Sequence, residues 1–193
     1  DWYSEDHVSW FPDGNKLIFV SDRGGNLDVN SNNKQEYFSN QLDIYSISIT
    51  DKKMLRLTNT LYNESYPVIS SDNQTIAYIS DKSGINNIYL TDDNFNNSYP
   101  ITNVMTGITQ LSWNGDDTQL IFTGFYKMGY DIFTLSNPKE LIGSINSIPL
   151  SKWKLESQES SLSKKNFKIR IDDDINDKYR NYILIDSENI KNN

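Results

Sequence analysis

The sequence has no cysteine, one histidine and one alanine among its 193 residues. The absence of cysteine excludes disulfides, thiolate nucleophiles and cysteine-ligated zinc sites. Any Ser-His-Asp triad or histidine-ligated metal site within this sequence would have to use His7. Ala77 is the one residue of the best helix-forming type, so the composition disfavours a helical protein.

Long apolar runs and an excess of positive charge are also missing. No run approaches the roughly 18 residues that a membrane helix needs, so we expect no membrane-spanning segment. Acidic residues outnumber basic ones by 26 to 18, and the net charge is −8. Nonspecific binding of nucleic acid relies on a basic surface, so we predict no nucleic-acid partner. No phosphate-binding glycine motif is present, and we predict no cofactor.

The residues that are abundant favour strands and turns. Asn occurs 24 times and Ser 23 times, and both types prefer turns to helix interiors. Ile, Tyr, Phe and Thr fill the stretches between them, which is typical of β-strands. The composition therefore predicts an all-β protein.

Three similar segments follow one another along the sequence. Each has a turn containing Asp, then an apolar run, then an Ile-aromatic pair preceded by Asp or Asn. Asp13, Asp72 and Asp116 occupy the same place in the turn, at separations of 59 and 44 residues. A period of about 40–50 residues is typical of the four-stranded blade of a β-propeller. The extra residues of the first copy fall between Asp22 and Asp43, where the polar stretch Leu27–Gln41 predicts an expanded loop.

Each copy can be divided into four expected strands. The first ends at Trp10, Ile69 or Trp113, and the second is an apolar run such as Leu17–Val20. The third begins at Asp43 in the first copy, and a short outer strand follows at residues 55–57. A single blade cannot bury both of its faces, so neighbouring blades must stack. The fold class that we predict is an all-β, partial β-propeller of three recognisable four-stranded blades with a C-terminal β or irregular extension.

The predicted boundaries follow from the repeats. Residues 1–147 form the propeller part, with blades at about 7–59, 60–103 and 104–147, and residues 148–193 form the extension. Within the extension, Phe167–Ile171 and Tyr182–Ile185 are predicted as two strands, forming either a degenerate fourth blade or an exit segment. The Ser-rich, charged stretch Glu156–Lys165 is predicted to be a loop.

These motifs resemble the TolB-type β-propeller repeat, a relative of the Trp-Asp repeat. Its hallmark is a Trp-Ser-Pro-Asp-Gly turn, an apolar strand, a Ser-Asp-Arg-x-Gly turn, an Asp-Ile-Tyr strand and a closing Leu-Thr. The second copy has Asn73 in place of the turn glycine, and the third has Thr123-Gly124-Phe125 in place of the Ser-Asp-Arg turn. The resemblance covers roughly residues 7–147. The matching residues of the first copy are Trp10, Pro12, Asp13, Gly14, Ser21, Asp22, Arg23, Gly25, Asp43, Ile44, Tyr45, Leu57 and Thr58.

The resemblance implies an exported bacterial protein of the periplasm or cell envelope that binds another protein without catalysis. Members of this family usually form closed propellers, often of six blades, whereas three copies are visible in this sequence. Three blades leave unpaired faces and edges. The chain is therefore part of a longer protein, or it closes by pairing with another copy, or its remaining blades are too diverged to recognise. We favour the first of these expectations over closure by a second copy.

The Leu27–Gln41 insertion is the best candidate for partner contact. Long loops on a rigid scaffold often bind partners, and Asp28, Tyr37 and Phe38 supply charge and aromatic surface. The aspartates that recur once per copy are predicted to stabilise turns, because one active site would not need three copies. We expect His7 to have a packing or surface role.

Two oxygen-rich stretches have some features of calcium loops. The series Asp28-x-Asn30-x-Asn32 has ligands at alternate positions but lacks the later Gly and Glu, and residues 172–177 match no known frame. We interpret both as solvated loops and predict no metal site.

The function predicted from the sequence is that of a noncatalytic protein-interaction scaffold. Two alternatives remain open. One is the propeller domain of a serine peptidase or other enzyme whose catalytic domain lies outside this chain, since no Gly-x-Ser-x-Gly elbow is present. The other is a glycan- or calcium-binding propeller.

Overall fold

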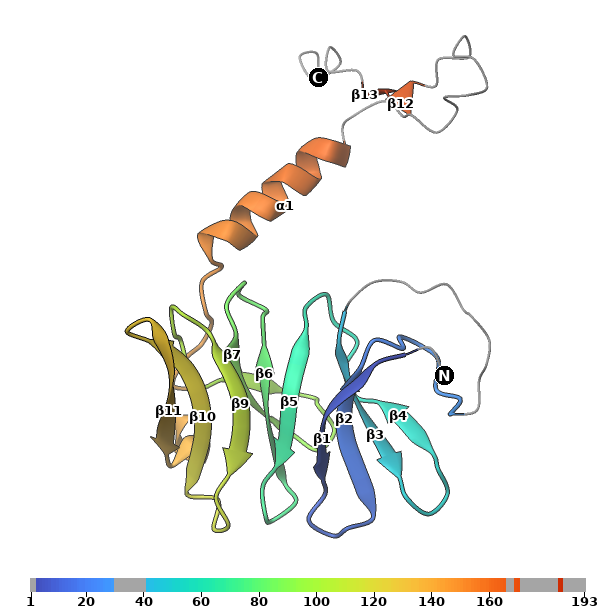
Figure 1. Ribbon diagram of the computed structural model, residues 1–193, viewed down its shortest axis with the longest axis vertical. Helices are drawn as coiled ribbons and strands as arrows, with labels where there is room; N and C mark the ends of the chain where they lie inside the picture. The colour runs from blue at the N-terminus through green and yellow to red at the C-terminus, as the bar shows by residue number, and fades with distance from the viewer. Residues whose placement is uncertain (1–2, 30–40, 166–168, 171–183, 186–193) are drawn as a thin grey trace. The chain divides into compact units, whose positions relative to one another are not determined.

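The computed structural model describes residues 3–29, 41–165, 169–170 and 184–185. The chain divides into two compact units, residues 1–150 and 151–193. The first unit contains three antiparallel sheets that stand side by side (Figure 1). This arrangement confirms the all-β fold and the three stacked blades.

The first two blades are four-stranded meanders, in which each strand pairs with the next along the chain. The first strands of both end at the residues predicted, Trp10 and Ile69, and β3 begins at Asp43 as expected. Blade I consists of β1 (Glu5–Trp10), β2 (Lys16–Ser21), β3 (Asp43–Ser48) and β4 (Met54–Arg56), and blade II of β5 (Glu64–Ile69), β6 (Thr75–Ser80), β7 (Asn87–Asp92) and β8 (Ser98–Pro100).

Blade III has three strands, so the prediction of four was wrong for this copy. It consists of β9 (Ile108–Trp113), β10 (Gln119–Tyr126) and β11 (Gly129–Ser136). After β11, Asn137 adopts a left-handed conformation (φ 49°) and the 3₁₀ helix η1 (Pro138–Leu141) begins. Because proline cannot donate a backbone hydrogen bond to a ladder, this segment turns away from the sheet where an outer strand would form.

The recurring aspartates stabilise the turns between the first and second strands, as predicted. In each copy the carboxylate accepts a hydrogen bond from the backbone amide two residues later, an Asx turn. The three N···O distances are 3.0 Å from Asn15 to Asp13, 3.0 Å from Gln74 to Asp72 and 3.3 Å from Thr118 to Asp116. This local bond explains why the same residue type recurs at this position.

Two hydrophobic clusters hold the blades together. We call the side of a blade that faces the following blade its front face, and the opposite side its back face. The first cluster joins the front of blade I to the back of blade II through Ile18, Val20, Ile44, Ile76, Tyr78 and Tyr89. The second joins the front of blade II to the back of blade III through Ala77, Ile79, Ile88, Leu90, Leu111 and Leu120.

Each first strand contains a bulge that the sequence did not reveal. The residues with positive φ are His7 (50°), Tyr66 (49°) and Gln110 (55°), and the strand register shifts beside each of them. They are 59 and 44 residues apart, the same separations as the turn aspartates. The bulge is therefore part of the repeat, although the three side chains have nothing in common.

The second unit corrects one prediction. Residues Lys152–Lys165 form helix α1, which includes the stretch Glu156–Lys165 that was predicted to be a loop. Lysine, glutamate, leucine and glutamine are good helix formers, and Lys152 and Glu156 form an i,i+4 ion pair at 3.7 Å. The predicted strand pair is present as β12 (Ile169–Arg170) and β13 (Leu184–Ile185), which pair antiparallel. In the part of the chain that the structure describes, no helix is long and apolar enough to cross a bilayer.

Candidate functional site

The insertion between β2 and β3 sets blade I apart from blade II. In blade II the corresponding connection is short and runs from Asp81 to Asn86. The chain turns there at Gly84, whose φ angle is 86°. Of the predicted contact residues, Asp28 is described and is exposed. Tyr37 and Phe38 lie outside the described residues, so their role stays a prediction.

The stem that leaves β2 is anchored by Arg23. This side chain is buried, and its guanidinium donates a hydrogen bond to the Ser21 hydroxyl at 3.3 Å and forms an ion pair with the Glu5 carboxylate. The Tyr45 hydroxyl donates to the carbonyl of Gly24 at 2.7 Å. A charge-assisted bond to a buried guanidinium is stronger than a neutral one, so this stem is held firmly against blade I.

The stem that enters β3 is anchored by Asp43. Its buried carboxylate accepts a hydrogen bond from Arg56 at 2.5 Å and another from the amide of Thr60 at 3.3 Å. Beside it, the amide of Leu42 donates to the Asn63 side chain at 2.9 Å. Both ends of the insertion are therefore fixed by side chains from the sheet and from the connection to blade II.

A buried glutamate lies beside the second stem. Glu64, the first residue of β5, is 2% exposed, and its carboxylate accepts hydrogen bonds from the Thr58 and Thr60 hydroxyls at 3.1 and 2.6 Å. Burial raises the pKa of this carboxyl to about 7, against the effect of the two hydroxyl donors, and the Asp43 and Asp81 carboxylates raise it further. Sequence reasoning missed Glu64, because nothing in the motif marks the first residue of this strand.

The remaining sequence candidates have structural roles. The His7 ring lies against the Tyr66 ring with centroids 3.7 Å apart, and burial lowers the pKa of the imidazole. This packing position agrees with the prediction. Among residues 3–29, 41–165, 169–170 and 184–185, no group of three or more His, Asp or Glu side chains is arranged to hold a metal ion. The oxygen-rich stretch at residues 172–177 lies outside the residues that the structure describes, so its interpretation stays a prediction.

A groove of about 580 Å³ lies on the back face of blade I, next to the start of the insertion. Val29, within the insertion, packs against the buried cluster of Phe19, Tyr45 and Met54 on this face. The groove is lined mainly by apolar side chains, and the charged residues Glu5, Asp6 and Arg23 are also part of its lining. Its lining consists of Glu5, Asp6, His7, Val8, Leu17, Phe19, Arg23, Val29, Ile47 and Met54.

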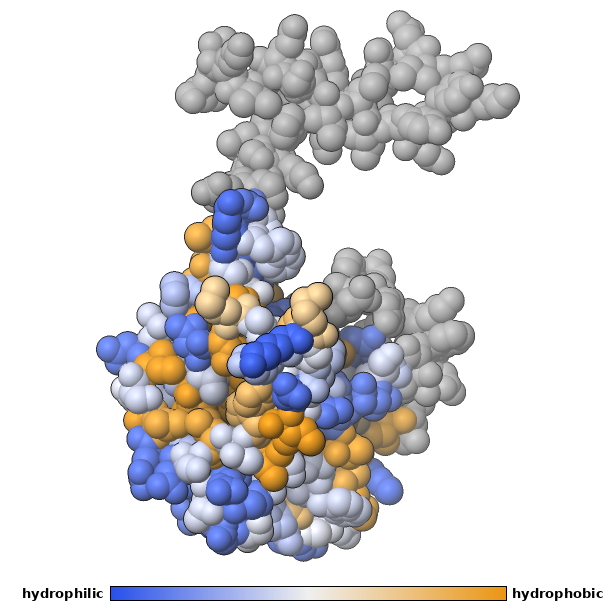
Figure 2. Space-filling model, turned by 60° about the vertical axis from the view of Figure 1, so that its left-hand side comes forward, coloured by the Kyte–Doolittle hydropathy of each residue, from blue (hydrophilic) through white to orange (hydrophobic). Residues whose placement is uncertain are grey.

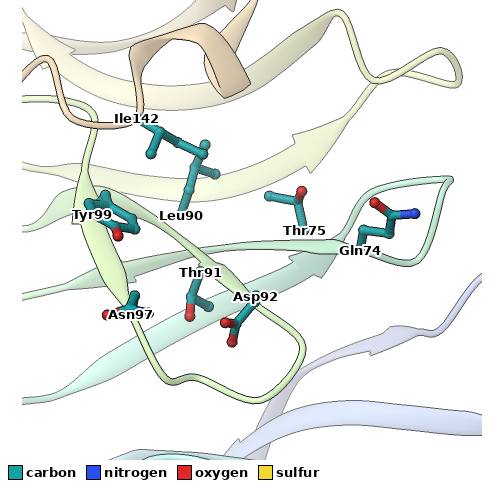
Figure 3. A pocket seen from close by; sticks show the side chains of 8 residues that line it. All are labelled: Gln74, Thr75, Leu90, Thr91, Asp92, Asn97, Tyr99 and Ile142. Carbon is teal, nitrogen blue, oxygen red and sulfur yellow. The ribbon is translucent and has the colours of Figure 1, made fainter.

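A second, smaller hollow of about 260 Å³ lies on blade II (Figure 3). Leu90 and Ile142 point toward one another across it, and Tyr99 lies beside them. Its volume is below the roughly 300–1,000 Å³ of pockets that enclose small molecules. We assign it no ligand.

No protein-family model matches the sequence, and neither does any curated protein. Solved structures do match the fold. A putative TolB from Agrobacterium tumefaciens aligns with a TM-score of 0.55 and 18% identity over 67% of this chain and 44% of its own. TolB from Acinetobacter baumannii aligns with a TM-score of 0.52 and 16% identity over 68% of this chain and 29% of its own.

An oligogalacturonate lyase in complex with manganese aligns with a TM-score of 0.50 and 18% identity, over 72% of this chain and 36% of its own. At these identities the likeness concerns the fold alone. The chain thus has the fold of a partial TolB-type β-propeller, and it spans less than half the length of each of these three proteins.

Proposed function

We propose that this chain is a propeller portion of a larger, exported protein of the bacterial periplasm or cell envelope, and that it binds a protein partner without catalysis. The partner contact is made by the Leu27–Gln41 insertion. The observation that carries this proposal is the anchoring of both stems, by Arg23 with Glu5 and by Asp43 with Arg56. Fixed stems reduce the entropy that a loop loses when it binds.

The envelope location is supported by the fold shared with the two TolB proteins and by the repeat motifs. Fractionation of cells that produce the whole protein tests this part of the proposal. Recovery with the periplasm or the envelope is expected, and recovery with the cytoplasm would contradict it.

Site-specific photocrosslinking in the producing cells tests the role of the insertion. A photoreactive residue at Tyr37 or Phe38 is expected to yield one discrete protein adduct. The matched control carries the same residue at Lys52, in the β3–β4 turn, and no adduct is expected there.

A loop exchange provides the second arm. Replacing residues 24–42 with the short Ser83–Asn86 turn of blade II keeps Arg23 and Asp43 in place, and blade II shows that the fold accepts this turn. Loss of binding to the partner captured by crosslinking, with an unchanged circular dichroism spectrum, supports the proposal. Unchanged binding after the exchange would overturn it.

A further inference from the structure

Glu64 is a buried acidic residue at the junction of blades I and II. Hydrophilic residues are spread over the surface in Figure 2, interspersed with apolar ones, and charged side chains normally lie on such a surface. Glu64 is only 2% exposed, and a carboxyl group that is taken out of water normally has a paired cation. In the part of the chain that the structure describes, no Lys, Arg or His side chain forms an ion pair with Glu64.

The repeat shows which cation is missing. Glu5 occupies the position of Glu64 in blade I, 59 residues earlier, and it forms an ion pair with Arg23. The counterpart of Arg23 in blade II is Lys82, which is exposed and whose Nζ lies 5.7 Å from the centroid of the Tyr62 ring. Blade II therefore keeps the acidic residue of blade I but not its buried cation.

The hydrogen bonds around Glu64 are complete only when this residue carries a proton. The Thr60 hydroxyl oxygen lies 2.6 Å from the Glu64 carboxyl and 3.0 Å from the carbonyl oxygen of Tyr62, and it accepts the Tyr62 amide at 3.2 Å. One hydroxyl hydrogen cannot serve two acceptors. If Glu64 is ionised, Thr60 donates to it and the Tyr62 carbonyl loses this donor. If Glu64 is protonated, it donates to Thr60, and Thr60 donates to the Tyr62 carbonyl.

The charged groups nearby also favour the protonated form. Burial is the main reason that the pKa of Glu64 is raised to about 7, and the carboxylates of Asp43 and Asp81 raise it further, against the effect of the hydroxyl donors. Arg56 is bound to Asp43, and the charge of Glu64 in turn raises the pKa of Tyr78 in β6. β9 has no titratable residue, and the other titratable residues on the elements around β5 are Glu5, Asp6, His7 and Lys16 of β1 and β2, Tyr45 of β3, Tyr62 of the connection, Lys82 of the β6–β7 turn and Tyr89 of β7.

The segment that carries Glu64 also holds the second stem of the insertion. The amide of Thr60 donates to the Asp43 carboxylate at 3.3 Å, and the amide of Glu64 donates to the carbonyl of Leu42 at 3.0 Å. The amide of Leu42 donates to the Asn63 side chain at 2.9 Å. Residues 60–64 are therefore the part of the chain on which the stem at Leu42 and Asp43 depends.

We propose that Glu64 is the proton-binding residue of a switch on the second stem of the insertion. Residues 60–64 hold Leu42 and Asp43 while Glu64 is protonated, and their hold weakens when Glu64 loses its proton to water. This inference rests on the proposed function and deepens it, because it supplies a regulation for the stem on which that function depends.

The switch works through two effects of ionisation. The ionised carboxylate of Glu64 takes the Thr60 hydrogen away from the Tyr62 carbonyl, which is in the segment that holds the stem. It also adds a negative charge beside Asp43 and Asp81. Like charges repel strongly where little water screens them, so residues 60–64 are pushed away from the groups that they bind.

The junction of blades II and III has the same backbone contacts without a titratable residue. The amide of Val104 donates to the Asn87 side chain at 2.9 Å, as Thr60 does to Asp43. The amide of Ile108, the counterpart of Glu64, donates to the carbonyl of Asn86 at 3.1 Å. The chain thus contains its own comparison for any effect of pH on these hydrogen bonds.

Amide hydrogen exchange of the full chain at pH 6 and pH 8 tests the switch. The protection of an amide is expressed relative to the unfolded chain at the same pH, because exchange itself is base-catalysed. Protection of the Thr60 and Glu64 amides is expected to fall about tenfold from pH 6 to pH 8, since local opening lowers the pKa of Glu64 from about 7 toward 4.5. Protection of the Val104 and Ile108 amides should stay constant. An equal change at both junctions, or no change at Thr60 and Glu64, would overturn the proposal.

Glu64→Gln tests whether Glu64 is the group responsible. The glutamine side chain can donate to Thr60 as a protonated carboxyl does but cannot ionise, so protection at Thr60 should be the same at pH 6 and pH 8. Glu140→Gln, an exposed substitution, is the matched control and should keep the wild-type change. A change that persists in Glu64→Gln would overturn the proposal.

A titration of the wild type by carbon-13 NMR needs no variant. The carboxyl carbon of Glu64 is expected to titrate near neutral pH, at the midpoint of the change in exchange at Thr60. A midpoint below about pH 5, in the range of an ordinary glutamate, would overturn the proposal.

A partner captured by crosslinking provides the functional arm. Its affinity for the wild type is expected to be lower at pH 8 than at pH 6, and its affinity for Glu64→Gln should change less. An equal pH dependence in both would overturn the regulatory role. The two proposals fail separately: lack of an adduct at Tyr37 and Phe38 contradicts the proposed function, whereas pH-independent exchange at Thr60 contradicts the switch.

Discussion

Thr58 donates its hydroxyl hydrogen to the Glu64 carboxylate over 3.1 Å, while the same oxygen accepts the amide hydrogen of Ile44 at 2.8 Å. In blade II, Thr102 accepts from the amide of Ile88 at 2.9 Å in the same way, but it donates to the neutral side chain of Asn87 at 3.0 Å. The hydroxyl of the closing Thr thus both donates and accepts a hydrogen bond in each of these two blades. The group that accepts from it is the titratable carboxylate of Glu64 in blade I and the uncharged amide of Asn87 in blade II.

Glu64→Gln is expected to flatten the pH dependence of stability. The folded state raises the pKa of Glu64 from 4.5 to about 7, so between these values it binds a proton that the unfolded state has lost. The stabilisation is fully present below pH 4.5 and is lost as the pH rises through about 7, with an upper limit of about 3 kcal/mol. Urea unfolding of the wild type should therefore show a lower free energy of unfolding at about pH 8 than at about pH 5 on account of this group. The surface substitution Glu140→Gln is the control, and an equal slope in both variants would contradict the prediction.

Thr102→Val is expected to reduce the free energy of unfolding by about 1–3 kcal/mol, because it leaves the buried Ile88 amide without its acceptor and removes one of the two hydrogen bonds that the Asn87 side-chain oxygen accepts. Ser147→Ala is the control. Ser147 is a hydroxyl-bearing residue of the third copy, one position after the residue that corresponds to Thr102, and it is exposed, so this substitution should change stability by less than about 0.5 kcal/mol. Chemical denaturation of both variants gives the comparison, and equal effects would show that the hydrogen bonds are unimportant.

Arg56→Met is expected to destabilise the chain strongly, by about 3–5 kcal/mol, because the Asp43 carboxylate would stay buried without its cation. Adding Asp43→Asn should recover most of this loss. Asn87 occupies the equivalent position in blade II, where its side-chain oxygen accepts from Thr102 and from the amide of Val104 without an arginine. The double-mutant cycle measures the recovery, and simple additivity of the two substitutions would contradict the argument.

Lys139→Met is expected to lower stability near neutral pH and to have a smaller effect in acid. Lys139 donates to Asp72 at 2.8 Å and lies 3.4 Å from Asp117, and the bond from Lys139 is the main reason that the pKa of Asp72 falls to about 2. A depressed carboxyl pKa stabilises the folded state above its unfolded value of 3.8, and this stabilisation is lost as the pH falls toward about 2. Because these side chains are partly exposed, the loss at neutral pH should be about 1 kcal/mol or less. Lys152→Met, in the exposed i,i+4 pair of α1, is the control, and a loss that is constant with pH would contradict the prediction.

Particular residues show how far the sequence could predict the fold. The strand ends at Trp10, Ile69 and Trp113 and the Asx turns at Asp13, Asp72 and Asp116 were predicted correctly, because each depends on neighbours within a few residues. The helix at Lys152–Lys165 was missed because its serines were weighed above the helix-forming residues between them. The absent outer strand of blade III was missed because an offset alone predicted it, although Pro138 precedes that position.

The candidate site was predicted only in part. The extra residues between Asp22 and Asp43 marked the insertion, and the repeat motif contained Arg23 and Asp43 without indicating what they bind. Their partners Glu5 and Arg56 lie on other strands, and sequence separation says nothing about which side chains face each other across a sheet. Glu64 was missed for the same reason.

By itself, the sequence determined the repeat, the turn chemistry and the strands of the first two blades, since these depend on short-range hydrogen bonding and on the alternation of apolar residues. Only the tertiary structure decided which carboxylates are buried, where the first strands bulge and how far equivalent positions of the three blades are exposed. Those properties depend on the environment that adjacent blades create, and identical residue types such as Ile88 and Ile132 are fully buried or largely exposed according to whether a blade covers them.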